Sequence, residues 1–404
     1  MSTTRTLSHR ARWAVPAVAA VVVAGALAGP PLLAAADEPA LPEATPVELL
    51  TSIAEAEPAA HSGTVVHTAR LGLPTGGLTE ITGADPIGLL GGSSTLRVWT
   101  DGAERSRVSL LGSASEYSVV HDGPQAWTYS STDDVVTHYT LDAAAQARYE
   151  DAQEGQTPPG APELPTPEEA AQQALEHVEE FSSVTVLEQA TVAGRDAYQL
   201  QITPETDGTL VEQVRIAVDG ETFTPLQVQV WSTSDTAETP ALEVGYTDIT
   251  FATPDDAVLS FSAPAGAEVV EETVSLPSEE ASGEASAEHT PPETIGEGWE
   301  SVIIIDDVDL QGLLAGDPEA LADAAASHPM PGSDSGQELM EEFMSDSEGN
   351  HGPPSLDAAA LYEQLTTEVP EGRVLSTTLL SVLITDDGRL LIGSVPVETL
   401  QEMA

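Results

Sequence analysis

Between residues 192 and 261, large apolar side chains recur at every second position in four short runs, and this alternation is the strongest constraint on the fold. The alternating positions are Tyr198, Leu200, Ile202, Val214, Ile216, Val218, Leu226, Val228, Val230, Leu242, Val244 and Tyr246. A period of two is the spacing of one face of a β-strand. The residues between them are mostly Gln, Arg, Glu and Thr, so the opposite face tolerates water. The region therefore predicts antiparallel strands with one buried face.

A second group of strands is predicted nearer the N-terminus, over residues 64–71, 95–99, 106–111, 117–121, 126–129 and 135–139. Asp101-Gly102 and Asp122-Gly123 separate neighbouring strands as turn dipeptides. Each group follows a predicted helix: Thr45, Pro46 and Glu48 begin the first, and a similar capping motif at residues 166–169 begins the second. The fold class expected is α+β, mainly β.

The first 36 residues have the pattern of an export signal. Arg5, Arg10 and Arg12 precede an apolar run over residues 13–33, which ends in three alanines at 34–36. A basic segment, an apolar segment and small residues are typical of a signal peptide, and we expect cleavage after Ala36. An apolar run of this length also suits an uncleaved helix that anchors the chain in the plasma membrane. In both cases the rest of the chain is extracytoplasmic, secreted or held at the cell envelope.

The charge balance is strongly acidic. Sixty-seven acidic residues face 12 basic residues, all of them arginine, for a net charge of −55. Because phosphate backbones are bound through positive charge, this composition excludes nucleic acid as a partner. A solvated acidic shell that keeps an exported protein soluble is the favoured interpretation, and cation binding by that shell is the weaker one. With no cysteine, the chain has no disulfide, no thiolate metal ligand and no cysteine for lipidation.

Three regions are expected after the signal segment: a main domain over residues 37–272, an acidic disordered linker over 273–300 and a small C-terminal α/β module over 301–404. The linker is rich in Glu, Ser, Ala and Pro, with too few large apolar side chains to offset the entropy of ordering. In the module, residues 302–305 predict a buried strand. Residues 374–384 and 389–395 predict a hairpin around Asp387-Gly388.

No motif in the chain carries recognisable chemistry. Glycine-rich phosphate loops, nucleophile elbows and zinc-binding helix motifs are absent from the sequence. The segment 332–336, Gly-Ser-Asp-Ser-Gly, lies in an acidic low-complexity run and is interpreted as linker. His61, His67, His121 and His138 lie in or beside predicted strands; ordinary strand-face histidines are favoured over a shared metal, so no metal site, cofactor or catalytic residue is assigned.

Three of the scarce basic residues, Arg97, Arg105 and Arg107, lie on adjacent predicted strands beside Trp99. Contact with a lipid head group is one interpretation. Pairing with some of the abundant surface carboxylates is the other, and it is favoured.

Several short phrases make the chain similar to the LolA-like lipoprotein-carrier superfamily, which includes the mycobacterial LppX and LprG carriers and the N-terminal domain of RseB. The phrases are Ser-Gly-Thr-Val at 62–65, Leu-Arg-Val-Trp at 96–99 with Asp101-Gly102, Ala-Gly-Arg-Asp-Ala-Tyr at 193–198, the run 224–231, and Phe261 with 264–267. They look like those of actinobacterial members and extend over residues 45–270. The missing lipidation cysteine departs from the mycobacterial carriers, so membrane attachment would depend on residues 13–33.

The resemblance implies a curved antiparallel half-barrel sheet capped by helices around an apolar cavity. It implies a protein that binds a lipid or an acylated lipoprotein without catalysis. The alternative within the same superfamily is an RseB-like envelope-sensing regulatory module that acts through a membrane protein partner and uses the C-terminal module. Strand phase marks eight residues as cavity candidates, each with an ordinary core position as its alternative: Val98, Val108, Tyr117, Val119, Trp127, Tyr129, Leu200 and Val228.

Overall fold

The computed structural model describes residues 41–73, 84–153, 178–234, 239–274, 293–306 and 362–404, with the exception of residue 364. The predicted signal segment, most of the second predicted helix and the segment 332–336 lie outside these ranges. Within the part of the chain that is described, no helix combines the length and the apolar character needed to cross a bilayer.

Helix α2 (Pro46–Glu55) confirms the predicted first helix and its start. The backbone N–H of Glu48 donates to Thr45 Oγ1 at 3.3 Å, and the N–H of Thr45 donates back to Glu48 Oε2 at 2.8 Å. This reciprocal pair satisfies two N–H groups that a helix terminus leaves free. The helix ends at Ala56, and its Leu49 is fully buried.

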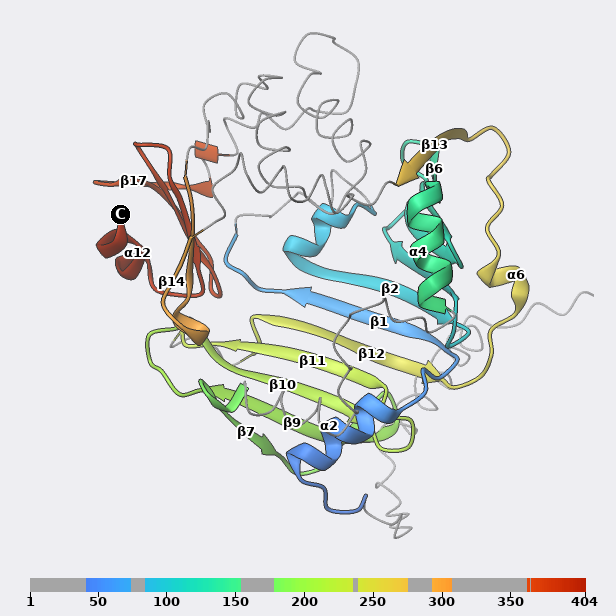
Figure 1. Cartoon of the computed structure of the whole chain (residues 1–404), viewed down its shortest axis with the longest axis horizontal. Coiled ribbons are helices and arrows are strands. Elements are labelled where there is room, and N and C mark those ends of the chain that lie inside the picture. Colours follow the sequence, from blue (N-terminus) through green and yellow to red (C-terminus); the bar gives the residue numbers. More distant parts are fainter. Residues whose placement is uncertain are drawn as a thin grey trace, which may run out of the picture. The chain divides into compact units, whose positions relative to one another are not determined.

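A 13-stranded sheet forms the main body, with strand order β13-β6-β5-β4-β3-β2-β1-β12-β11-β10-β9-β7 and β8 paired to β9 (Figure 1). Its strands are β1 (His61–Ala69), β2 (Gly92–Thr100), β3 (Arg105–Leu111), β4 (Glu116–Asp122), β5 (Gln125–Ser130), β6 (Val135–Leu141), β7 (Ser182–Val186), β8 (Ala190–Val192), β9 (Arg195–Pro204), β10 (Val211–Asp219), β11 (Pro225–Ser232), β12 (Leu242–Thr250) and β13 (Glu268–Val274). The sheet is open, with β13 and β7 at its ends. The mainly β, open half-barrel type of fold is thus confirmed. One detail differs from the antiparallel expectation, since β13 pairs with β6 in parallel.

The two groups of strands predicted from the sequence meet at β1. This strand pairs with β2 on one side and with β12 on the other, both antiparallel. A strand near the start of the described chain therefore joins the two halves into one sheet. Such non-local pairing is not visible as a local sequence pattern.

Both predicted glycine turns are present. Gly102 and Gly123 adopt φ values of 76° and 59°, a region that glycine enters without steric cost. At Gly102 a Cβ atom would also clash with the carbonyl oxygen of Pro58. Glycine is therefore required there both by conformation and by space.

The register of β9 to β12 separates an apolar from a polar face, as the alternation predicted. Residues directly opposite one another in antiparallel strands share a face. Ile216 lies opposite Leu200 and Val228, and Val228 lies opposite Val244. We call the surface so formed the apolar face; on β9 to β12 it comprises Leu200, Ile202, Val214, Ile216, Val228, Val230, Leu242 and Val244.

The other side of these strands, the polar face, carries side-chain hydrogen bonds between neighbouring strands. Arg215 Nε donates to Gln201 Oε1 at 3.1 Å. Gln227 and Gln229 both donate to Glu243 Oε1, at 2.8 and 3.1 Å. The Arg215 guanidinium also lies over the Trp231 ring, 5.3 Å from its centroid.

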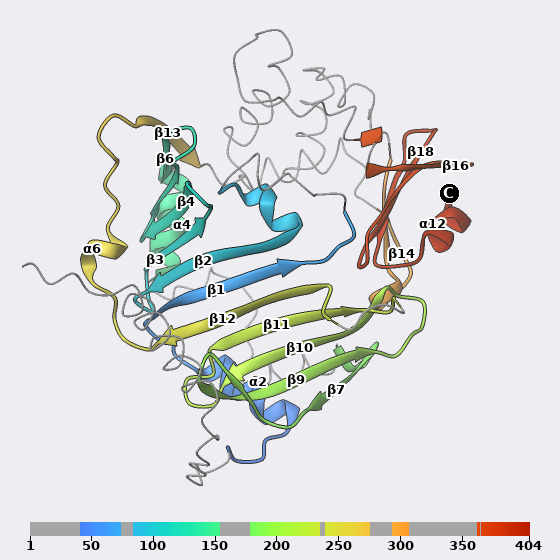
Figure 2. The ribbon, with the colours of Figure 1, turned by 180° about the vertical axis from the view of Figure 1, so that it is seen from behind.

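Two helices that the sequence analysis did not predict pack on the sheet. Helix α4 (Ala143–Gln153) begins where Asp142 Oδ1 accepts from the N–H groups of Ala144 and Ala145. The short α6 (Asp256–Leu259) is capped by Asp255 in the same way. Figures 1 and 2 show α2 and α4 on the same side of the sheet, in front of it in one view and behind it in the other. The 3₁₀ turn η1 (Pro86–Leu90) contacts β1 and β2.

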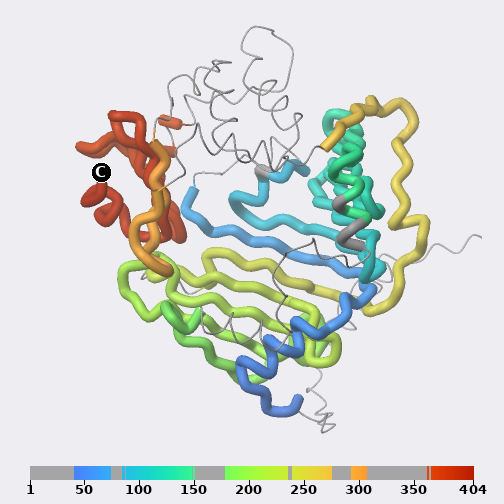
Figure 3. The backbone as a smooth tube through the Cα atoms, in the orientation of Figure 1, coloured from blue at the N-terminus to red at the C-terminus, as the bar shows by residue number. Residues whose placement is uncertain are grey.

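The C-terminal region forms a second sheet of six strands in the order β14-β15-β19-β18-β17-β16. Its elements are β14 (Glu293–Ile295), η2 (Gly298–Glu300), β15 (Val302–Ile305), β16 (Thr367–Val369), β17 (Gly372–Ser376), β18 (Ser381–Thr385), β19 (Leu390–Gly393) and helix α12 (Val397–Met403). Figure 3 follows the chain from the orange β14 and β15 to the red β17, β18 and β19. β14 and η2 fall within the range predicted as linker.

One strand prediction in this region is wrong. The range 374–384 is not a single strand but two, β17 and β18, which pair with each other. The chain reverses between them because Thr377 Oγ1 accepts from the N–H groups of Leu379 and Leu380. The predicted turn at Asp387-Gly388 is confirmed, with the Gly388 N–H donating to the Thr385 carbonyl at 3.1 Å.

Candidate functional site

The apolar face is closed over only in part: Leu200 is fully buried, whereas the row across β10, β11 and β12 is not. Val214, Ile216, Val228, Val230 and Val244 are all only half-buried, although they occupy the middle of a large sheet. The hydrophobic clusters formed by fully buried described residues lie elsewhere. One fills the C-terminal sheet, and the other gathers Val192, Ala197, Ala217 and Leu226.

Six of the eight predicted cavity residues share this face. Val98 lies opposite Val108, which lies opposite Val119, and Tyr117 is two positions from Val119 on the same strand. Val119 is 41% exposed. Leu200 and Val228 belong to the same face on β9 and β11. The lining role of these six stays a prediction.

Trp127 and Tyr129 lie on the opposite face, so their grouping with the other six is wrong. They pair with Val120 and Ser118, the alternate positions of β4. Trp127 is packed there between two rings, His138 at 4.9 Å and Phe261 at 5.7 Å between centroids. Two aromatic residues were taken as cavity lining, whereas Trp127 completes a stack on the far side.

The three arginines proposed for a head group also lie on that far side. Arg97 is opposite Ser109, and Ser109 is opposite Ser118, so their side chains point away from Val98 and Val108. Arg105 pairs with Asp101 at 2.9 Å and with Asp256 at 3.0 Å; Arg107 pairs with Glu116 at 3.3 Å. Arg97 is exposed and lies over the Trp99 ring. The structure therefore does not bring these arginines to the apolar face.

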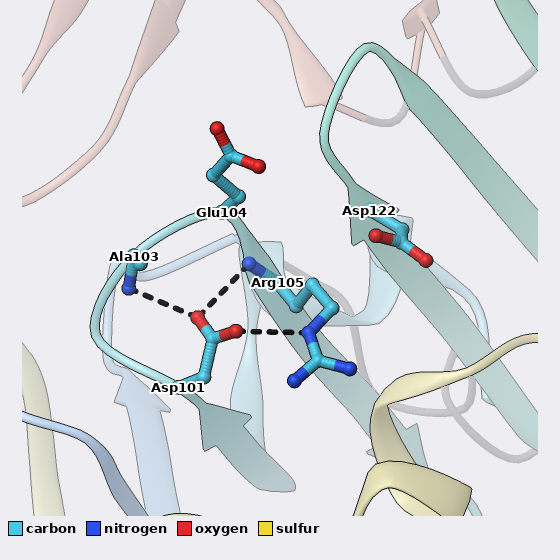
Figure 4. Close-up of a pocket in the computed structure, with 5 residues that line it drawn as sticks. All are labelled: Asp101, Ala103, Glu104, Arg105 and Asp122. Atoms are coloured by element: carbon cyan, nitrogen blue, oxygen red, sulfur yellow. Dashed lines mark hydrogen bonds and ion pairs between the residues drawn. The ribbon is translucent and has the colours of Figure 1, made fainter.

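Around Arg105 the surface has an open depression of about 480 Å³, lined by Asp101, Ala103, Glu104, Arg105 and Asp122 (Figure 4). Burial alone would raise the pKa of Asp101, but hydrogen bonds from the Arg105 side chain and backbone and from the Ala103 N–H outweigh it and lower that pKa. The pKa of Arg105 is raised, chiefly by its bonds to Asp101 and Asp256. The carboxylate of Asp101 and the guanidinium of Arg105 are thus hydrogen-bonded to each other, as expected of residues that stabilise the turn between β2 and β3.

The predicted strand histidines do not converge. His61 contacts the Ala59 carbonyl at 2.8 Å and Tyr246 Oη at 2.9 Å, His121 contacts the Glu104 carbonyl, and His138 contacts Glu271 and Gln125. His67 makes no hydrogen bond through its buried Nδ1. Among the described residues, no three His, Asp or Glu side chains are grouped so as to hold a metal ion.

An ion pair with a buried carboxylate, which the sequence analysis missed, holds the start of β9 to the end of β10. The Arg195 guanidinium donates to Asp219 Oδ2 at 2.7 Å and to Asp219 Oδ1 at 3.1 Å, and it reaches Glu221 at 2.6 Å. Asp219 is fully buried and accepts in addition from the N–H groups of Glu221 and Thr222. The Asp-Gly turn at 219–220 after an apolar strand was its only local signal. This pair supports the fold.

The C-terminal sheet is joined to the main sheet by hydrogen bonds at strand ends. Leu210 N–H and Thr209 Oγ1 both donate to the Ser394 carbonyl, at 2.7 and 2.8 Å. Ser232 Oγ donates to the Thr378 carbonyl at 2.7 Å, and the Thr378 N–H donates to the Leu71 carbonyl at 3.0 Å. A hollow of about 330 Å³, lined mainly by Ser and Thr, lies along this seam. In the described part of the chain, the C-terminal module therefore contacts the main sheet through these polar groups.

Comparison with known proteins gives similarities of structure alone. No protein-family model and no curated protein sequence matches the chain. A structure of MucB is 17% identical over 89% of this chain and 96% of its own, with a TM-score of 0.36. The structure of the Pseudomonas aeruginosa MucA/MucB complex is 15% identical over 88% of this chain and 95% of its own, with a TM-score of 0.38. A LolA superfamily protein, NE2245 from Nitrosomonas europaea, is 13% identical over 54% of this chain and 99% of its own, with a TM-score of 0.19.

Proposed function

We propose that the protein is an extracytoplasmic, non-enzymatic carrier that holds an acyl chain of a lipid or a lipoprotein against the apolar face. The observation that supports this proposal is the row of half-buried aliphatic side chains across β10, β11 and β12, exemplified by Ile216, Val228 and Val244. Half-buried aliphatic side chains in neighbouring strands leave an apolar surface that a ligand could cover. Aliphatic side chains with little polar character suit a ligand that is itself a hydrocarbon.

The energetics are adequate for such a ligand. Burying one methylene contributes about 0.8 kcal/mol, so a ten-carbon segment contributes roughly 8 kcal/mol before the entropy of ordering is subtracted. No charged group is needed for that part of the affinity. The proposal accordingly assigns no role to the arginines of the far side, and it places the protein outside the cytoplasm on the strength of the N-terminal pattern at residues 5–36.

A regulatory module that acts through a protein partner is the second candidate. It is favoured by three exposed aliphatic side chains of the C-terminal module: Ile295 of β14 at 38%, Ile303 of β15 at 43% and Leu380, between β17 and β18, at 37% exposure. Each could contribute to contact with another protein. This candidate requires residues 293–404 for partner binding, whereas the carrier requires the apolar face.

Native mass spectrometry with lipid extraction, on protein purified from its own host, tests the proposal. A stoichiometric acyl lipid is expected to accompany the wild-type chain. Val228→Asp should lose it, because the new carboxylate lies on the apolar face, while the matched control Gln227→Asp places the same charge on the polar face and should retain it. An unliganded mass that does not change on incubation with envelope lipids would reject the carrier and direct attention to protein partners.

A further inference from the structure

Strand β13 is weakly held in the main sheet. It lies at one end of the sheet, where β6 is its only partner among the described strands, and the two run parallel (Figure 1). Parallel pairing is slightly less stable per residue than antiparallel pairing. None of the seven residues of β13 is buried, and Val269 is 48% exposed. The attachment of β13 therefore depends on its backbone ladder and on the few side-chain contacts that it makes with β6.

One of these contacts is an ion pair across the two strands. Glu271 of β13 lies directly opposite His138 of β6, and its Oε2 atom is 2.7 Å from His138 Nδ1. On the other side of the ring, His138 Nε2 is 3.0 Å from Gln125 Oε1. Because a carboxylate oxygen and an amide oxygen only accept hydrogen bonds, these contacts use both N–H groups of the charged imidazolium. A neutral ring carries one N–H and keeps both bonds only if the Gln125 amide turns over.

The surroundings of His138 also favour the charged ring. The imidazole is stacked on Trp127 with the ring planes 1° apart and the centroids 4.9 Å apart, within the distance at which an indole face attracts a cation. The His138 side chain is 18% exposed, so its charge keeps some contact with water. The strands on either side of β6, β5 and β13, contain no lysine or arginine. His138 is the one basic residue of these three strands.

The other titratable groups around His138 are acids and phenols. Besides Glu271 they are Tyr129 of β5, Asp122 of β4, Asp134 just before β6, and Tyr149 and Glu150 of α4, which contacts β6. Two further carboxylates of β13, Glu268 and Glu272, lie on the opposite face of that strand. The carboxylates in this set repel Glu271, so the charge on His138 is what offsets them.

We propose that His138 is a pH-sensitive latch for β13. Imidazole is the side chain whose charge ordinarily changes between pH 5 and 8. With the ring protonated, the ion pair with Glu271 and the stacking on Trp127 hold β13 to β6. With the ring neutral, this attraction is lost and the carboxylates of β13 are uncompensated, so the strand opens more often while the rest of the main sheet stays folded. β13 is therefore held at acidic pH and loosens as the pH rises.

Opening of β13 exposes new surface. It uncovers the hydrogen-bonding edge of β6, and an uncovered strand edge can pair with another strand. It also releases the seven residues of β13 into the connection that leads to the C-terminal sheet. The latch is independent of what the apolar face holds, so the carrier proposal can fail without affecting it, and the reverse is also true.

Hydrogen exchange of the full chain, followed by mass spectrometry, tests the latch. Exchange of β13 is compared at pH 5.5 and pH 8.5 after correction for the intrinsic pH dependence of exchange, with β9 as the internal reference. Relative to that reference, protection of β13 in the wild-type protein should fall about fivefold at the higher pH, the size expected of one partly exposed ion pair with a cation–π contact. His138→Gln keeps a hydrogen-bonding side chain without the charge, so the pH dependence should disappear and protection should stay low.

Two further variants separate the latch from other effects of pH. His121→Gln is the matched control, because His121 bonds a backbone carbonyl instead of a carboxylate, and it should leave the pH dependence of β13 unchanged. Glu271→Gln removes the other charge at a side chain that is 67% exposed, so it covers the case in which His138→Gln does not fold, and it should also abolish the pH dependence. Equal protection of β13 at the two pH values in the wild type, or a pH dependence that survives Glu271→Gln, would refute the latch.

Discussion

The two sheets of this protein follow the same alternation of apolar and polar residues, yet they treat their apolar sides differently. In the C-terminal sheet Val302, Leu383 and Leu391 are fully buried, and Leu400 of α12 packs into the same cluster. In the main sheet Ile216 and Val228 stay half-buried. The difference shows that an alternating pattern determines which side of a strand is apolar but not whether that side is filled by protein.

The main sheet gains stability from the buried part of its apolar face, which includes Leu200, and from contacts away from that face. The ion pair between Arg195 at the start of β9 and Asp219 at the end of β10 is one source, and the small cluster around Leu226 is another. The C-terminal sheet gains its stability from a conventional core. This contrast leads to four predictions, ordered from the largest expected effect.

Asp219→Ala should be the most damaging single change in the main sheet. It removes the buried partner of Arg195 and the acceptor for two turn N–H groups, which should lower the free energy of unfolding by about 3–5 kcal/mol. Urea denaturation followed by tryptophan fluorescence measures the change. Glu221→Ala, which removes only the exposed partner of Arg195, is the matched control and should cost less than about 1 kcal/mol.

The same aspartate should make stability depend on acid. Burial opposes ionisation of Asp219, but the Arg195 bonds and the turn N–H groups prevail, so its pKa in the folded chain is below the ordinary 3.8. The stabilisation is complete above pH 3.8 and is lost as the pH falls through the lower, folded-state value. A wild-type unfolding free energy with the same slope below pH 3.8 as that of Asp219→Ala would contradict this assignment.

The third prediction tests the contrast between the sheets directly. Leu391→Ala leaves a cavity in a closed core and should lower the unfolding free energy by about 3 kcal/mol, whereas Ile216→Ala on the half-buried face should cost roughly 1 kcal/mol. Both are measured by chemical denaturation in lipid-free protein. Equal losses would mean that the apolar face is an ordinary core.

Structural features set by neighbouring residues could be predicted from the sequence, whereas features set by residues far apart in the chain could not. The capping box at Thr45, the turns at Gly102 and Gly123 and the faces of β9 to β12 are set by neighbouring residues, and they were predictable. The side on which Trp127 packs depends on the register of β4 and β5 and on Phe261, which lies far along the chain. The pairing of β1 with β12 and the parallel contact of β13 with β6 are equally non-local.

The candidate site shows the same limit. Leu200 and Val228 were identified because alternation gives the phase of their strands. The head-group arginines were misplaced relative to the site because scarcity of positive charge says nothing about which face a residue takes. His67 was noticed as a strand histidine, but its lack of a partner is a property of the folded sheet alone.

The smallest effect is predicted for Arg97→Gln, and it bears on the same contrast between two sides of one sheet. Arg97 is exposed, lies over Trp99 and points away from Val98 and Val108. Its removal should change the affinity for a fluorescent acyl probe by less than about twofold, since a charge on the solvated far side is screened from a ligand on the apolar face. The affinity is measured by fluorescence titration with that probe, with Val98→Asp as the matched change one residue along. A tenfold loss in Arg97→Gln would mean that the ligand reaches around the sheet to the arginines, and the division of the main sheet into a binding side and a supporting side would have to be abandoned.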